Sequence, residues 1–182
     1  MTLDAAASPR RSRTIGIVYL IYFLTAILGE TLHSRGFLVV GNAVSLIGYG
    51  CYVALTLLFY SLFKPVNASL SLIAACFSLV GCIIGALGMF HLLPTGVSPL
   101  LFFACYCLLI GYLIMRSIFL PRVLGAMMLL AGLGWLIFSL PAASHFAAYL
   151  EALGILAEGS LMLWLLVIGI DVRRWKQQAK FA

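Results

Sequence analysis

Two carboxylates in one long apolar segment are the residues of this chain best suited to chemistry. The stretch LGILAEGSLMLWLLVIG, residues 153–169, carries Glu158, and Glu151 lies seven residues earlier. At helical spacing the two share a face, with Glu158 about 10 Å deeper than Glu151. Glu158 is thirteen residues from both His145 and Asp171, close to the middle of the segment. A carboxyl group placed there can exchange a proton or anchor a small ligand.

Such an acid must face the protein interior. A charged carboxylate in the centre of a bilayer costs at least about 2.5–3.5 kcal/mol, so an intramembrane acid is a functional hypothesis by default. We expect Glu158 to be neutral or hydrogen-bonded, because desolvation disfavours the charged form and no Lys or Arg is expected at mid-depth. The expected donors are tyrosines of a second apolar segment and the outer histidines. A purely structural hydrogen bond between helices remains the alternative.

That second segment carries a stripe of polar side chains on one helical face. Spacings of three and four residues connect its members, which are Asn42, Ser45, Tyr49, Tyr52, Thr56 and Tyr60. Polar groups in hydrocarbon need partners, so this face points inward, either as a hydrogen-bond ladder or as the wall of a polar cavity. The candidate residues for binding a ligand or proton are therefore Glu158, Glu151, Tyr49, Tyr52 and Glu30.

A metal site near the outer mouth is a second hypothesis. Glu30-Thr-Leu-His33 places a carboxylate and an imidazole on one helical face, and His91 and His145 lie at the ends of other apolar segments. His and carboxylate side chains suit zinc or iron. The pattern is common and histidines at such ends are usually amphipathic caps, so no cofactor is predicted and Zn or Fe remains an alternative.

The elements that position these residues are transmembrane helices. The chain of 182 residues is 64% hydrophobic and 9% charged, which leaves too little polar surface for a soluble domain of this size. Six apolar segments have roughly the 17–25 residues of a spanning helix. They cover residues 14–32, 41–63, 68–93, 98–115, 120–140 and 146–170. The prediction is an all-α, polytopic membrane bundle of six transmembrane helices over residues 14–172, between basic tails at 1–13 and 173–182.

Basic residues predict the orientation of the bundle. All of the eleven Lys and Arg residues except Arg35 lie on one side of the six segments, so both termini are expected in the cytoplasm. Basic residues at segment ends favour topology and anionic lipid over nucleic acid as the explanation of the net charge of +6. The expected lipid-binding residues are Arg10, Arg11, Arg13, Arg173, Arg174 and Lys176.

Four stretches resemble a bacterial integral-membrane family, the domain of unknown function 4386. They are GIVYLIYFLTAILGE, LFYSLFKPVN, IGYLIMRSIFLPRVLGAMMLLAGLGWLI and LAEGSLMLWLLVIG, within residues 15–175. The resemblance implies a helix bundle in the bacterial cytoplasmic membrane and supplies no catalytic residues. Glu30 and Glu158 stand at positions that match its acid-bearing elements, and Ala157 stands where the family usually has glycine.

Three functions follow from these observations. The first is a non-enzymatic bundle with an outward-facing polar cavity that binds or moves a small ligand or protons through Glu158. The second is a metal-dependent enzyme that acts on lipid at the outer leaflet through Glu30, His33, His91 and His145. The third is an accessory or scaffold subunit without chemistry. Convergence of Glu158 and the tyrosines on one cavity would favour the first.

Overall fold

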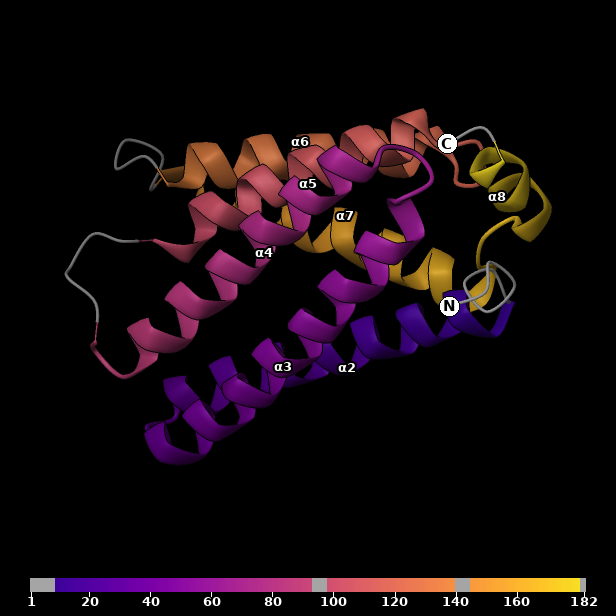
Figure 1. Ribbon diagram of the computed structural model, residues 1–182. Coiled ribbons are helices and arrows are strands. Elements are labelled where there is room, and N and C mark those ends of the chain that lie inside the picture. The colour runs from indigo at the N-terminus through magenta and orange to yellow at the C-terminus, as the bar shows by residue number, and fades with distance from the viewer. Residues whose placement is uncertain (1–8, 93–97, 140–144, 181–182) are drawn as a thin grey trace.

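The computed structural model describes residues 9–92, 98–139 and 145–180, and within these ranges the regular structure is helical. Figure 1 shows the helices running side by side along one long axis. Their bounds are α2 Pro9–Ser34, α3 Leu38–Phe63, α4 Ala68–Met89, α5 Pro99–Arg116, α6 Arg122–Phe138, α7 Ala147–Val167 and α8 Val172–Ala179.

Polar residues and prolines in the connections set where several helices begin. Asn67 caps α4 by accepting a hydrogen bond from the backbone N–H of Leu70. Ser98 caps α5, with Pro99 in the first turn, where its missing N–H costs nothing. Asp171 caps α8 by accepting from the N–H groups of Arg173 and Arg174. The short connections make consecutive helices antiparallel neighbours.

Helices α2 to α7 form a closed ring around one core. Each packs on the next along the chain, and α2 also packs on α7, which closes the ring. Where helices approach closely, glycine makes room: a Cβ on Gly16 would lie 2.6 Å from the backbone nitrogen of Leu166, between α2 and α7. On α5, Gly111 faces Gly125 of α6 in the same way. Small residues at such crossings are typical of helix packing in membranes.

Within the part of the chain that the structure describes, five helices are long and apolar enough to cross a membrane. They are Ser12–Ser34, Leu38–Phe63, Ala68–Met89, Pro99–Arg116 and Ala148–Val167. These helices confirm the predicted all-helical, multi-pass class. The predicted fifth span, residues 120–140, is represented by α6, which has 17 residues because Pro121 delays its start and it ends at Phe138. The structure therefore supports five candidate spans and a shorter apolar helix.

The outer surface of the ring is apolar. Large hydrophobic side chains on several helices are strongly exposed, among them Ile27 at 62%, Val39 at 83% and Val123 at 62%. A water-soluble bundle would turn such side chains inward. Their exposure agrees with a lipid-facing surface.

The basic ends of the chain are more ordered than expected. Helix α2 begins at Pro9, so the last part of the expected tail 1–13 is helical. Helix α8 occupies most of the expected tail 173–182 and crosses the end of the bundle at which α2 begins (Figure 1). Trp175 anchors it, since this side chain is 1% exposed and its Nε1 donates to the carbonyl of Leu62 at 2.9 Å.

Candidate functional site

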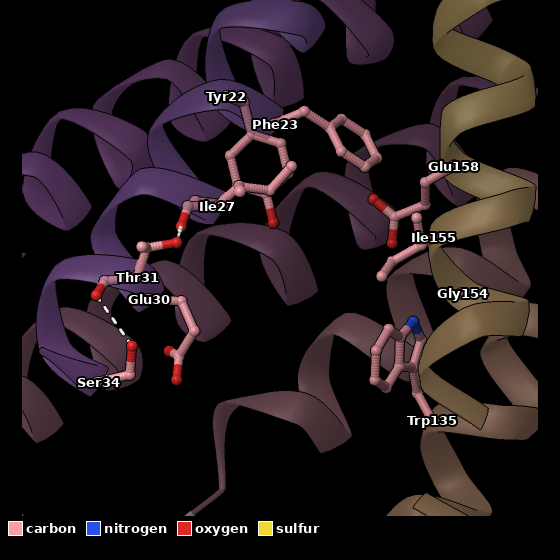
Figure 2. A pocket seen from close by; sticks show the side chains of 11 residues that line it. Tyr22, Phe23, Ile27, Glu30, Thr31, Ser34, Trp135, Gly154, Ile155 and Glu158 are labelled. Carbon is pink, nitrogen blue, oxygen red and sulfur yellow. Dashed lines mark hydrogen bonds between the residues drawn. The ribbon is translucent and has the colours of Figure 1, made fainter. Parts of the chain in front are cut away.

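Glu158 of α7 accepts hydrogen bonds from two other helices. The hydroxyl of Tyr19 on α2 donates to Oε2 at 2.8 Å, and Sγ of Cys107 on α5 lies 3.8 Å from Oε1. The indole N–H of Trp135 on α6 points toward the same carboxyl group from one turn away along α7 (Figure 2). The expectation that tyrosines of the second apolar segment or the histidines would be these donors is wrong, because α2, α5 and α6 face Glu158 at this depth.

The two nearest donors are held rigidly. Tyr19 is 1% exposed, and its ring packs against Phe23 at 5.4 Å and edge-on against Phe59 at 6.0 Å between centroids. Cys107 is fully buried in the core. The carboxyl group therefore meets donors that the surrounding packing already holds in place.

Trp135 reaches the site because Gly154 lies beneath it. A Cβ at Gly154 would overlap the indole ring, so the missing side chain lets the ring lie directly on α7, one turn before Glu158. Figure 2 shows the indole and Glu158 on the same wall. In the sequence pattern Gly154-x-x-x-Glu158, the glycine thus leaves room for an aromatic ring and the acid follows one helical turn later.

A cavity of about 420 Å³ opens in front of Glu158. Along α2 it runs from Tyr22 to Ser34, about 18 Å at 1.5 Å per residue, and so reaches the end of α2 away from the termini. In Figure 2, Glu158 and Trp135 face Tyr22, Phe23 and Glu30 across this space. The carboxyl group is thus both hydrogen-bonded and accessible from the cavity.

A second cavity of about 290 Å³ adjoins the first. The two share Tyr22, Ala26, Glu30, Trp135 and Glu158 as lining residues. Ser45, Tyr49 and Tyr52 of α3 add a polar and aromatic wall on this side. The stripe predicted on the second segment therefore contributes a cavity wall through these residues, while Thr56, further along it, hydrogen-bonds Ser78 between helices.

Four of the five candidate binding residues meet at this second cavity: Glu158, Glu30, Tyr49 and Tyr52. Glu151 is exposed and lines neither of these two cavities. The sequence reasoning missed Tyr19, Tyr22 and Trp135. The spacing of Tyr19, Tyr22, Ala26 and Glu30, at three and four residues, was the available signal.

The four metal candidates are dispersed. Nε2 of His33 lies 2.7 Å from Oδ1 of Asn42, and its ring covers Gly41. His91 and His145 are exposed at helix ends, and Glu30 lines the cavities. Over residues 9–92, 98–139 and 145–180, no group of three or more His, Cys, Asp or Glu is placed to hold a metal ion.

Comparisons with known proteins locate part of this site in a family. The family model described as "Domain of unknown function (DUF4386)" matches residues 95–169, which contain α5, α6 and α7. An "Uncharacterized protein" of Archaeoglobus fulgidus is 28% identical over 123 residues, 64% of this chain and 76% of the relative. No solved structure matches. The matched segment holds Cys107, Trp135 and Glu158, whereas Tyr19, Glu30 and the α3 tyrosines precede it. Residues 95–169 therefore resemble the domain of unknown function 4386, as two of the four quoted stretches predicted.

Proposed function

We propose that this protein is a multi-pass membrane protein that binds a small ligand or a proton in the cavity in front of Glu158. The observation that carries the proposal is that this side chain is held by other helices and also borders empty space. Glu158 accepts hydrogen bonds from Tyr19 and Cys107, and it also lines both cavities. A buried acid that is reachable from a cavity can exchange a proton or contact a ligand.

A purely structural role explains less of the geometry. A carboxyl group that serves only as a strut between helices is best sealed from solvent, where its hydrogen bonds are strongest. Here Glu158 accepts a hydrogen bond from Tyr19, yet a cavity of about 420 Å³ lies beside the carboxyl group. A second carboxyl group, that of Glu30, lines the same space and lies eleven residues after Tyr19 on α2.

The orientation we propose has six crossings and both termini in the cytoplasm of a bacterial-type inner membrane. The start of α2 and the whole of α8 lie at one end of the bundle (Figure 1), and the basic residues gather toward this end in the sequence. The cavity extends toward the other end of α2, which would then face outward. Anionic lipid would contact Arg13, Arg173, Arg174 and Lys176 at the cytoplasmic surface, together with Arg10 and Arg11.

Trp135 gives a direct readout of the proposed protonatable group. In purified protein reconstituted in lipid nanodiscs, tryptophan emission is followed from pH 4 to pH 10. We expect a transition as Glu158 changes charge, because its carboxyl group adjoins the indole N–H. The variants E158Q and W135F should both lose this transition, the first because the titrating group is gone and the second because the reporter is gone.

E151Q is the matched control, since Glu151 lies on the same helix but is exposed and outside both cavities. It should keep the transition of the wild type. A transition that survives in folded E158Q would assign the titration to another group. A wild type without any transition between pH 4 and pH 10 would overturn the proposal that Glu158 exchanges protons with the cavity.

A further inference from the structure

We propose that the ligand of this cavity is a small organic cation, an amine or quaternary ammonium with an apolar body. This inference rests on the proposed function and names the class of molecule that the site would bind. It is drawn from the charge, the aromatic walls and the size of the two cavities taken together.

The ionisable side chains that line the two cavities are all acidic. Glu158 and Glu30 both line the two cavities, and the described lining residues include no Lys, Arg or His. An anion would meet two carboxyl groups without a compensating cation, whereas a cation would neutralise them in a medium of low dielectric constant. The site therefore selects against anions and favours a positive ligand.

The walls between the two acids are aromatic. Tyr22, Phe23 and Trp135 surround the space between Glu30 and Glu158 in Figure 2. On the second side, Tyr52 packs edge-on against Tyr22 at 4.6 Å and against Phe103 at 5.1 Å between centroids. Aromatic faces attract ammonium groups, and tryptophan does so most strongly. The lining thus combines the two features that recognise an organic cation, a carboxylate and an aromatic enclosure.

A bare metal ion fits the site less well than an organic cation. Zinc needs about four protein ligands and calcium six to eight oxygens. The described residues supply two carboxyl groups that reach the cavities from different helices, and no cluster of three metal ligands. Most of the remaining lining is apolar or aromatic, which suits the hydrocarbon part of an organic molecule.

The available volume sets the size of the ligand. At about 30 Å³ per water molecule, the second cavity holds about ten waters and the larger about fourteen. Benzyltrimethylammonium, with a quaternary nitrogen and one phenyl ring, is of this size and cannot lose its charge. Neopentylbenzene has the same shape without the charge, and phenylacetate carries the opposite charge.

The test measures binding of these three compounds to the protein in nanodiscs, with tryptophan emission and calorimetry as readouts. Empty nanodiscs correct for partition into lipid. We expect saturable binding of benzyltrimethylammonium alone. E158Q should weaken it by at least about 30-fold, as for loss of one partner of a desolvated ion pair. W135L should weaken it by about 2- to 30-fold, the range of a cation–π contact.

E151Q serves as the control and should bind as the wild type does. Because E158Q could disturb folding, circular dichroism and size-exclusion profiles accompany each variant. E30Q, at the more open end of the cavity, is a second carboxylate variant and should also bind the cation more weakly.

Equal binding of neopentylbenzene, or unchanged cation binding in folded E158Q and E30Q, would overturn the inference. Failure of the cation to bind while the Trp135 transition with pH persists would overturn it too, and would leave the protonatable cavity standing. Loss of both signals in folded wild-type protein would overturn the proposed function as well.

Discussion

The hydrogen bond between Tyr19 and Glu158 gives the sharpest test of the site geometry. We consider the single variants Y19F and E158A and the double variant. Y19F removes only the hydroxyl, and the ring keeps its contacts with Phe23 and Phe59, since Tyr19 is 1% exposed and tightly enclosed. E158A removes the acceptor. Each single variant leaves one polar group of the 2.8 Å bond without this partner.

The expected coupling energy follows from the type of bond. Hydrogen bonds between membrane helices average about 0.6 kcal/mol and reach about 1.7 kcal/mol in double-mutant cycles. Bonds to a charged group contribute about 1.5–3 kcal/mol in soluble proteins. With a buried phenol donating at 2.8 Å to a carboxyl group, we expect a coupling of about 1–2 kcal/mol between Tyr19 and Glu158.

The assay is the free energy of unfolding, measured by steric trapping in bicelles for the wild type, both single variants and the double variant. The pair Y19F and E151A is the control and should be additive within about 0.5 kcal/mol, because exposed Glu151 shares no contact with Tyr19. A coupling below about 0.3 kcal/mol for Tyr19 and Glu158 would refute the conclusion that α2 supplies the donor.

Three further predictions concern packing and topology. G154A should lower the free energy of unfolding by about 1–3 kcal/mol and shift the emission of Trp135, because the new methyl group overlaps the indole ring. G159A is the control on the same helix. Its methyl group would meet open space, so the free energy of unfolding should stay the same or rise slightly. W175F should raise the rate of tryptic cleavage within α8, since it removes the hydrogen bond to Leu62 and part of the buried ring, and cleavage at the wild-type rate would contradict the anchoring role. A C-terminal fluorescent protein should fluoresce and a C-terminal alkaline phosphatase should be inactive in intact cells, and the opposite pattern would contradict cytoplasmic termini.

The fold class could be predicted because it depends on composition along the chain. A chain with 64% hydrophobic residues in long segments must form helices that satisfy their own backbone in lipid. The five candidate spans agree with this prediction. The predicted fifth span was drawn from residue 120 to residue 140 because hydropathy does not register backbone geometry, whereas Pro121 shortens the helix to Arg122–Phe138.

The candidate site could be predicted only where a residue's own chemistry forces its environment. A carboxyl group at mid-depth must face inward, so Glu158 was identified from position alone, and Glu30, Tyr49 and Tyr52 from helical spacing. Glu151 was grouped with them because it shares a face with Glu158 in the sequence. In the structure its side chain is exposed and lines neither cavity.

The sequence by itself therefore determined the membrane class and the inward position of Glu158, and residues 95–169 are also similar to a family of unknown function. Only the tertiary structure decided which side chains contact the carboxyl group of Glu158. Helical periodicity defines the face that a residue occupies, but the helix opposite that face depends on close approaches such as Gly16 against Leu166 and Gly154 beneath Trp135. These contacts bring Tyr19 and Trp135 to Glu158 and leave the cavity beside them open.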